Sequence, residues 1–594
     1  MQENRPSRSE RRDERKERLT SSKKLAPTAD IHEPESSSAD DVVEAPVPVS
    51  PPAQPFKHSG RAANSLRASL AVVGGRTAGA LSRRLHLGGG TSIAGIVAQR
   101  LYPDIIEHLS TQLQQGSLLV TGTNGKTTTS GFIAAILSDA GLRVWRNREG
   151  SNLLRGIAGA LVIRTRPNGR LRRAGQAISI FEVDEAVMPS AVATIPTRVV
   201  VFTNLFRDQL DRYGEVDSVL ERWQRTIAAL SPETILVLNA DDPTIADLGR
   251  QFAGRVIYFG IEDPELDIER QEGAGARHQV MDTRACSNCG KEYTYSLRFY
   301  SHIGHYSCPH CGQGRPAVTV SATKVESDSF DRQRIQVHLP DRSGEMIVPL
   351  PGLYNVYNAL AAIATASALD LAWEPMASGI EQFKPAFGRG ERVQIDGRTI
   401  RMLLAKNPTG FNEVLRTLFT SGNRRHVLFV LNDNIADGKD ISWIWDVDFE
   451  LALQGIATLT VAGTRARDLA LRLKYAGLNP RDMLIAPSAP LRAERKEERI
   501  SSSARRAERR AKRATPQAQE RPAAEDALST RSQALPSARV AKTYGIAHAL
   551  DRALLQTPEG ETLFIVPTYT GLLEIHHELE RRGLTPHYWE ETGP

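Results

Sequence analysis

Short apolar runs alternate with helical patterns between about residues 117 and 260. Runs of this length predict strands, and strands that alternate with helices predict a mostly parallel sheet with flanking helices, so we expect an α/β fold. The runs are Ser117-Leu-Leu-Val, Ala177-Ile-Ser-Ile-Phe, Arg198-Val-Val-Val-Phe, Thr234-Ile-Leu-Val-Leu and Arg255-Val-Ile-Tyr-Phe.

Polar residues follow several of these runs. Ligands of a parallel sheet bind beyond the carboxyl ends of its strands, so these residues are candidates for a site. Because Mg²⁺ takes only one or two carboxylates from a protein, we expect Glu182 first among these acids to bind it, whereas Asp241 and Asp242 fit equally well as helix caps. The full set is Glu182, Asp184, Glu185, Thr203, Asn204, Asp208, Asp211, Asn239, Asp241 and Asp242.

A glycine turn connects the first run to a helical pattern that begins near Ser130. Such a turn presents unpaired backbone N–H groups and the positive end of a helix to an anion, which predicts a phosphate site. Val120 stands where the full eight-residue P-loop has glycine, so this is a shortened form. We expect Lys126 to reach the β/γ oxygens of ATP and Thr127 to ligate Mg²⁺. The residues expected to bind the nucleotide here are Gly122, Thr123, Asn124, Gly125, Lys126, Thr127 and Thr128.

The only four cysteines of the chain form two Cys-x-x-Cys pairs, Cys286 with Cys289 and Cys308 with Cys311. This spacing predicts a closed, structural zinc site with four sulfur ligands. Disulfides are the alternative, but nothing resembles a secretory signal, which favours a reducing cytosol. If all four thiolates hold zinc, the chain has no cysteine left to act as a nucleophile.

Composition bounds the organisation of the chain. Its 594 residues are 40% hydrophobic and include no apolar run long enough to span a bilayer, so we expect a soluble protein of two or three domains. The net charge is +6, yet many basic residues lie in two tracts without an apolar pattern, residues 1–64 and about 489–537. We expect both tracts to be disordered, and their composition gives little support to nucleic-acid binding.

Four motifs together resemble the central ATPase domain of the Mur ligases, over roughly residues 65–395. This family forms amide bonds by phosphorylating a carboxylate with ATP and letting an amine attack the acyl phosphate. The resemblance implies that Asn204 is a nucleotide-binding residue, that Asn355 and Asn358 lie near the adenine, and that Arg389 lies near the phosphates or ribose. The motifs are Thr121-Gly-Thr-Asn-Gly-Lys-Thr-Thr, Thr203-Asn-Leu-Phe-Arg-Asp-Gln-Leu-Asp-Arg-Tyr-Gly, Leu238-Asn-Ala-Asp-Asp-Pro and Gly352-Leu-Tyr-Asn-Val-Tyr-Asn.

Two positions depart from the amino-acid-adding Mur ligases. Gln209 stands where those enzymes typically have a metal-binding histidine, and Gln224 and Arg225 stand where many carry a carbamylated lysine. Both departures argue against the usual second metal site.

The second half of the chain resembles the C-terminal domain of the MurT family, the synthetase subunits of lipid II isoglutaminyl synthase. That family also carries a four-cysteine zinc ribbon, which would occupy about residues 280–316 here. The resemblance implies a Rossmann-like α/β domain over 396–594. The motifs are Lys406-Asn-Pro-Thr-Gly-Phe-Asn, Leu431-Asn-Asp-Asn-Ile-Ala-Asp-Gly-Lys-Asp-Ile-Ser-Trp-Ile-Trp-Asp and Val566-Pro-Thr-Tyr-Thr-Gly-Leu-Leu-Glu.

The MurT resemblance implies a cytoplasmic enzyme that acts at the inner face of the membrane. ATP would activate the α-carboxylate of D-glutamate in the lipid II stem peptide, and ammonia would convert it to D-isoglutamine. Glutamine hydrolysis generally needs a Cys paired with a His, so a separate GatD-type glutaminase would supply the ammonia. An aspartate of the synthetase subunit would complete that triad, and the sequence does not choose among Asp433, Asp437 and Asp440.

Two other functions remain open at this point. One is a ligase that adds an amino acid, as the murein and folylpolyglutamate enzymes do. The other is a nucleic-acid-binding NTPase that uses the ribbon and the basic tracts; its binding would weaken steeply with salt.

Overall fold

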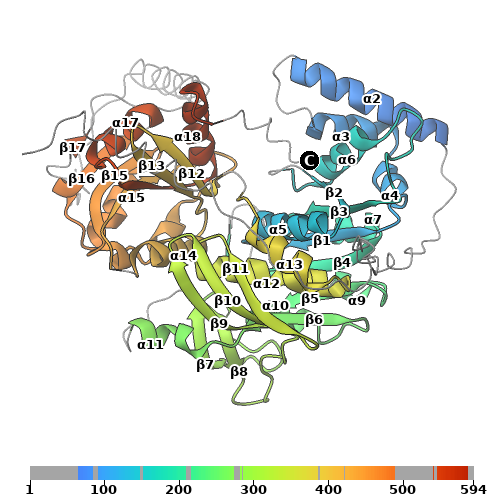
Figure 1. Cartoon of the computed structure of the whole chain (residues 1–594), viewed down its shortest axis with the longest axis horizontal. Coiled ribbons are helices and arrows are strands. Elements are labelled where there is room, and N and C mark those ends of the chain that lie inside the picture. The colour runs from blue at the N-terminus through green and yellow to red at the C-terminus, as the bar shows by residue number, and fades with distance from the viewer. Residues whose placement is uncertain are drawn as a thin grey trace, which may run out of the picture. The chain divides into compact units, whose positions relative to one another are not determined.

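The computed structural model describes residues 65–84, 91–147, 151–208, 216–272, 281–283, 285–385, 388–420, 422–487, 539–540 and 545–585. Figure 1 shows their helices and strands. The two tracts expected to be disordered, 1–64 and 489–537, lie outside the described residues, as do Gln209 and Asp211.

Among the described residues, nine strands form one sheet, in the order β11-β10-β9-β6-β5-β4-β1-β3-β2. All five apolar runs of the sequence are strands of this sheet and pair in parallel, which confirms the predicted α/β architecture. The parallel strands are β1 (Ser117–Thr121), β2 (Arg143–Arg146), β3 (Ala177–Glu182), β4 (Thr197–Phe202), β5 (Ile235–Asn239) and β6 (Val256–Ile261).

Three further strands extend this sheet beyond β6: β9 (Val320–Ser329), β10 (Arg332–His338) and β11 (Ser343–Val348). β9 pairs with β6 in parallel, and β10 pairs antiparallel with both of its neighbours. Along β10 only every second residue is buried, so this part of the sheet produces no continuous apolar run in the sequence.

Successive residues of the central strands face opposite sides of the sheet and build two hydrophobic cores. Leu118 and Val120 belong to the core on one side, whereas Leu119 and Val200 belong to the core on the other. The helices α5 (Lys126–Asp139), α12 (Leu353–Ala368) and α13 (Trp373–Glu381) cover the first side. The second side carries α2 (Ser65–Arg84), α3 (Thr91–Leu101), α4 (Ile105–Ser110), α6 (Leu154–Arg164), α7 (Met188–Thr194), α9 (Val216–Ala228) and α10 (Pro243–Leu248).

A second sheet has the order β12-β13-β18-β14-β15-β16-β17 in the part of the chain that is described. It is parallel except for the pair β12 and β13. β12 belongs to this sheet although it precedes residue 396, where the C-terminal domain is expected to start. The expected domain boundary near residue 395 stays a prediction. The strands are β12 (Arg389–Ile395), β13 (Arg398–Leu403), β14 (Arg425–Val430), β15 (Ile456–Gly463), β16 (Met483–Pro487), β17 (Arg539–Val540) and β18 (Thr562–Pro567).

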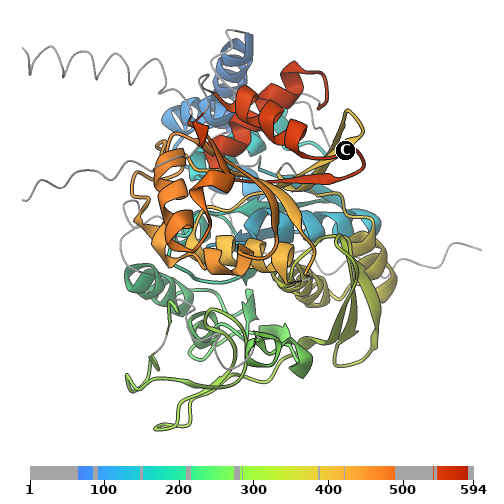
Figure 2. The same cartoon turned by 90° about the vertical axis from the view of Figure 1, so that its left-hand side faces the viewer.

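Helices also cover both sides of the second sheet (Figure 2). On one side, α14 (Pro408–Phe419) and α15 (Ala466–Tyr475) pack on Val427 and Phe429. On the other side, α17 (Ile546–Gln556) and α18 (Tyr569–Arg581) pack on Leu428 and Val430. Short helical turns complete this half and the ribbon region: η1 (Pro264–Leu266), α11 (Ile268–Glu272), η2 (Ser442–Asp446), η3 (Phe449–Ala452) and η4 (Pro480–Asp482).

A two-stranded hairpin, β7 (Thr294–Tyr300) and β8 (Ile303–Ser307), lies in the chain between β6 and β9 and carries the cysteines near its base. Among the described helices, none combines the length and hydrophobicity that a membrane crossing requires.

Candidate nucleotide site and four-cysteine cluster

The glycine turn joins the end of β1 to the start of α5, as the sequence predicts. Gly125 immediately precedes α5 with φ of 86°, a conformation that favours glycine. A Cβ atom at this position would lie 2.1 Å from the side-chain oxygen of Asn358, so the space also excludes any other residue. The first backbone N–H groups of α5 have no partner within the helix and can bind an anion.

The end of the neighbouring strand β4 holds this turn in place. The Asn124 N–H donates to Oδ1 of Asn204 at 2.9 Å, and the Thr203 hydroxyl donates to the Asn124 carbonyl at 2.8 Å. Thr123 is fixed in the same way, since its hydroxyl donates to the Phe206 carbonyl at 3.1 Å. Asn204 therefore supports the turn, and its contact with a nucleotide stays a prediction.

The Lys126 ammonium lies over the turn. It donates to the carbonyl oxygens of Gly122 and Thr123 and forms an ion pair with Glu185 at 3.0 Å. Both charged side chains are largely buried. Glu185 is in turn positioned by Trp223, whose indole N–H donates to the Glu185 carbonyl at 2.9 Å. The Lys126 ammonium, which is expected to reach the phosphates, is thus already held beside the turn by these contacts.

Thr127 and Glu182 meet at the end of β3, which sequence alone could not establish. The Thr127 hydroxyl donates to Oε2 of Glu182 at 2.9 Å, and the Ser130 hydroxyl donates to Oε1 at 2.7 Å. Glu182 is only 2% exposed, and Arg146 lies 3.4 Å from its carboxylate. Two adjacent hard oxygen donors beside a phosphate turn fit Mg²⁺, which would neutralise phosphate charge there.

Asn355 and Asn358 lie on α12, directly behind the turn. Asn358 accepts from the Thr129 hydroxyl at 3.2 Å and donates to Asn355 at 3.0 Å, while Asn355 donates to the Pro351 carbonyl at 2.6 Å. Both side chains are buried. Their contact with adenine stays a prediction, as does the role of Arg389, which begins β12 and whose side chain lies outside the described residues.

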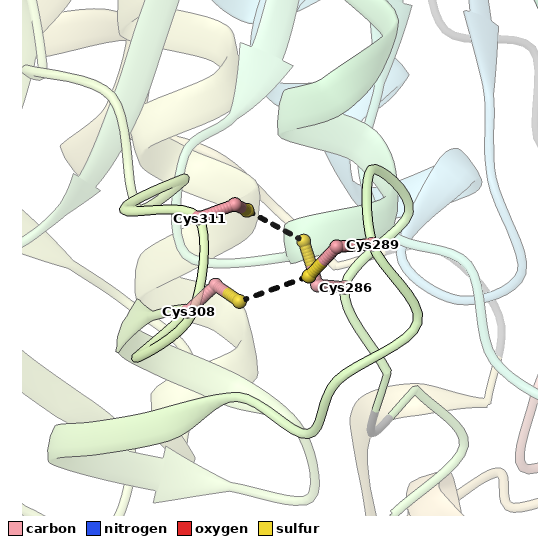
Figure 3. A group of neighbouring side chains, drawn as sticks. All are labelled: Cys286, Cys289, Cys308 and Cys311. Atoms are coloured by element: carbon pink, nitrogen blue, oxygen red, sulfur yellow. Dashed lines mark hydrogen bonds between the residues drawn. The ribbon is translucent and has the colours of Figure 1, made fainter.

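The four cysteine sulfur atoms form one cluster, all within 4.8 Å of one another (Figure 3). Cys286 and Cys311 are 3.6 Å apart at sulfur, and Cys289 and Cys308 are 3.4 Å apart. Sulfur atoms in a tetrahedral site with bonds of about 2.3 Å lie roughly 3.8 Å from one another, so the spacing fits a zinc ion.

The two cysteine turns have the same backbone geometry. Gly290 N–H donates to the Cys286 carbonyl and Gly312 N–H to the Cys308 carbonyl, at 2.8 and 3.0 Å. Both glycines have positive φ, 72° and 75°. A pair of matching turns that brings four thiols together could hold a metal ion, as the cysteine spacing predicts.

Asp241 and Asp242 follow β5 and have different roles. Asp242 caps α10 by accepting from the backbone N–H groups of Thr244 and Ile245, which confirms the helix-cap prediction for this residue. Asp241 caps no helix, so the cap prediction is wrong for it. Its carboxylate instead accepts from the Tyr357 hydroxyl of α12 at 2.7 Å and from Nε of Arg315, at the ribbon side, at 2.5 Å.

The three candidate aspartates for a partner triad all lie in the segment after β14, but their surroundings differ. Asp433 pairs with Arg465 at 2.8 Å; burial raises the pKa of Asp433, but hydrogen bonds from Thr464 and Arg465 outweigh it and lower the pKa overall. Asp437 is buried and accepts from the Thr570 N–H at 2.8 Å, and burial raises its pKa. Asp440 is exposed and accepts from Ser442 at 2.8 and 3.0 Å.

With this geometry in view, comparisons with known proteins identify the family. Residues 120–307 match the Mur ligase middle domain and residues 404–511 match the MurT ligase C-terminal domain. The chain is 34% identical over 389 residues to the MurT subunit of lipid II isoglutaminyl synthase (glutamine-hydrolyzing) from Staphylococcus aureus (strain COL), covering 65% of this chain and 83% of that one. The chain belongs to the MurT family.

A second MurT relative, from Streptococcus pneumoniae (strain ATCC BAA-255 / R6), is 30% identical over 414 residues and covers 70% of this chain and 88% of its own. The fold is also that of solved Mur-type ligases. A pseudomurein peptide ligase type C from Methanothermus fervidus gives a TM-score of 0.53 at 21% identity, with 79% of each chain covered. MurF from Acinetobacter baumannii gives 0.51 at 17% identity, covering 82% of this chain and 80% of that one.

The expected departure from the amino-acid-adding ligases stays a prediction, but the structure of this MurT-family chain places two of its residues. Gln224 and Arg225 lie on the exposed face of α9, and Arg225 pairs with Glu221 on the same helix at 2.9 Å. Neither side chain takes part in the Thr127 and Glu182 arrangement. Membership of the MurT family makes the chain an ATP-dependent ligase of the Mur type.

Two contacts of the MurT-type C-terminal segment reach the phosphate turn, and sequence reasoning missed both. The amides of Asn407 and Asn124 bond reciprocally at 3.1 and 3.3 Å, and Lys406 pairs with Asp208 just after β4. Asn407 is buried and also caps α14, because its side-chain oxygen accepts a hydrogen bond from the Gly410 N–H at 2.8 Å. The Asn-Pro dipeptide at 407–408 is a typical helix start, but its sequence gives no sign of the distant partner.

Proposed function

We propose that this chain is the synthetase subunit of a lipid II isoglutaminyl synthase. It would convert the α-carboxylate of D-glutamate in the lipid II stem peptide to the amide of D-isoglutamine, using ATP and ammonia. The names of its MurT relatives, which are glutamine-hydrolyzing synthase subunits, support this substrate. The observation that carries the proposal is the phosphate turn, where Lys126, Thr127 and Glu182 converge.

The reaction we infer has two steps. The substrate carboxylate attacks the γ-phosphoryl group of ATP and releases ADP, and ammonia then attacks the acyl carbon and releases phosphate. Lys126 would balance the charge on the phosphoryl oxygens as it moves from ATP to the carboxylate. The largely buried setting of Lys126 and Glu185 supports a site that keeps water from competing with ammonia for the acyl phosphate.

Ammonia would come from a GatD-type glutaminase that forms a heterodimer with this chain. Such a partner needs its own nucleophile, and all four cysteines here share one cluster whose spacing fits zinc, leaving none to hydrolyse glutamine. Of the three aspartates, we infer that Asp440 serves the partner's catalytic histidine. Its carboxylate is exposed and bonds only locally to Ser442, whereas Asp433 is engaged by Arg465 and Asp437 is buried against Thr570.

Mass spectrometry of lipid II tests the proposal. The purified chain, with its glutaminase partner, ATP, Mg²⁺ and glutamine, is expected to lower the substrate mass by about one dalton as OH is replaced by NH₂. A mass gain equal to an added amino acid would show an amino-acid-adding ligase instead. An unchanged mass, with ammonium chloride also supplied, would refute both.

A further inference from the structure

The helix α2 exposes apolar side chains along one face. The exposed fractions are 76% for Leu66, 62% for Leu70, 47% for Val73 and 55% for Leu81. At helical spacing these four positions form one stripe about 22 Å long, which we call the α2 stripe. Monomeric soluble proteins seldom leave a row of large apolar side chains on one helix face, so the stripe calls for a partner.

The stripe is not needed for the packing of α2. The opposite face of the helix, with Ala68, Ala71 and Val72, is fully buried in the core that α2 shares with α3, α4 and α6. Figure 1 shows α2 on the outer side of α3, with its other face turned away from the sheet. The helix is therefore apolar on both faces, one facing the protein and one facing outward.

The stripe continues onto the end of α3. Leu101 is 52% exposed, and its Cδ1 atom lies against Gly74 of α2. The absence of a side chain at Gly74 lets the two helices approach, and Leu101 packs against α2 at this position. The outward surface is thus a patch formed by two helices rather than a single line of residues.

The charged residues of α2 and α3 themselves all have one sign, although Asp104 and Glu107 lie near Tyr102, as Arg67 does. Between residues 45 and 103 the sequence contains seven Lys or Arg residues and no Asp or Glu. Within α2 these include Arg67 at its start and Arg83 and Arg84 in its last turn, all exposed. The next acids along the chain are Asp104 and Glu107, at α4. Exposed leucines on a helix whose own charged residues are all arginines match a bilayer surface with anionic headgroups, since the apolar chains insert and the guanidinium groups bind phosphates.

We propose that the α2 stripe, with Leu101 and the flanking arginines, is a docking surface for an anionic membrane. The choice of a membrane rests partly on the proposed function, because a lipid-linked substrate requires the enzyme to work at a bilayer. Docking through α2 would hold the phosphate site near the surface where that substrate is anchored. It requires no membrane-spanning helix and is compatible with their absence among the described residues.

Vesicle binding of the full chain tests this without lipid II, ATP or the partner, so it is independent of catalysis. The probes are vesicles of phosphatidylglycerol and phosphatidylcholine in equal amounts, with pure phosphatidylcholine as the uncharged control. The wild type is expected to sediment with the anionic vesicles and to be released by salt. The double variant Leu66→Gln/Leu70→Gln is expected to bind roughly tenfold more weakly, because two inserted side chains are lost.

A matched control replaces two apolar side chains elsewhere that are at least as exposed on average. Ile435 is 85% exposed and Leu555 is 73% exposed, and both lie far along the chain from α2. Ile435→Gln/Leu555→Gln is expected to bind vesicles as the wild type does. A circular dichroism spectrum of each variant verifies that the helices are intact, and the N-terminal tract is identical in all of them.

Charge is tested separately with Arg67→Gln/Arg83→Gln/Arg84→Gln, which is expected to lose the preference for anionic vesicles. Equal binding by the wild type and the Leu66/Leu70 variant would overturn the proposal. A second result would also overturn it: the wild type does not bind vesicles but self-associates, and the Leu66/Leu70 variant does not self-associate. The stripe would then be an interface between two copies of the chain. Sedimentation velocity distinguishes the latter result.

Discussion

The loop after β1 and the loop after β14 hold equivalent places in their sheets. Each follows the carboxyl end of a central parallel strand, where ligands of such sheets bind. The first loop is built from glycines, backbone N–H groups and Lys126, and it suits an anion. The second carries Asp433, Asp437 and Asp440, and it suits a cation or an imidazole.

The two loops also differ in how firmly their polar groups are held. Lys126 of the first loop is largely buried and pairs with Glu185, and Thr127 beside it donates to the buried Glu182 at the end of β3. In the second, the three carboxylates range from buried Asp437 to exposed Asp440. The fold thus supplies the position in both cases, while the side chains decide whether the loop is a closed chemical site or a surface offered to a partner.

The largest effect is expected when the cation of the first loop, Lys126, is removed by substitution. Lys126→Ala should lower ATP turnover by about three orders of magnitude or more, because phosphoryl-transfer charge loses its counterion. Adding Glu185→Gln to the variant avoids leaving an unpaired buried carboxylate. Lys324→Ala, which changes an exposed ion pair with Glu326, is the control and should keep full turnover. Normal turnover in the Lys126 variant would contradict the phosphate assignment.

The next effect concerns the second loop. With the glutaminase present, Asp440→Asn should reduce glutamine-driven amidation by about a hundredfold or more, because the partner's imidazolium loses its acid. Amidation from added ammonium should remain, which a misfolded variant would not allow. Asp482→Asn, an exposed aspartate of η4, is the matched control. If glutamine and ammonium reactions fall together, the loop belongs to the synthetase site rather than to the partner.

A third prediction concerns the four-cysteine cluster, which lies outside both loops. Cys286→Ser/Cys289→Ser should abolish bound zinc, measured by elemental analysis, and lower the unfolding free energy by about 3 kcal/mol. Glu292→Gln, an exposed change in the same ribbon, should alter neither quantity. A full equivalent of metal in the double cysteine variant would rule out the cluster as its site.

The smallest effects are expected in the pH dependence of the unfolding free energy, to which Asp433 and Asp437 of the second loop should contribute in opposite directions. The pKa of Asp433 is lowered, so its contribution to stability is present above the unfolded-state pKa and is lost as pH falls through the folded-state value. The pKa of Asp437 is raised, so its contribution is lost as pH rises through that higher value. Denaturant unfolding across the acidic range should therefore give changes of opposite slope for Asp433→Asn and Asp437→Asn. Parallel slopes would contradict the assigned environments.

The sequence predicted those parts of the molecule that depend on local patterns. The five apolar runs became parallel strands, and the spacing of Cys286, Cys289, Cys308 and Cys311 brought four sulfur atoms together. It did not predict the strands β9 to β11; along β10, which pairs antiparallel with both neighbours, single buried residues alternate with exposed ones and leave no apolar run.

Contacts between distant segments were beyond the sequence for a different reason. Asn124 and Asn407 are 283 residues apart, and neither position carries a pattern that names the other. Asp241 and Asp242 are adjacent and chemically identical, yet one caps a helix and the other joins three elements. Such roles are set by tertiary packing, which only the folded chain reveals.

The carboxylate of Asp241 has a consequence for redox chemistry. It bonds to Arg315, four residues beyond the last cysteine, and to Tyr357 on the helix whose Asn358 backs the phosphate turn. If an oxidant converted the four thiols to disulfides, the cluster could hold no metal and the Arg315 end of this connection would loosen. The helix behind the phosphate turn would then lose one of its supports although no residue of the turn itself had reacted.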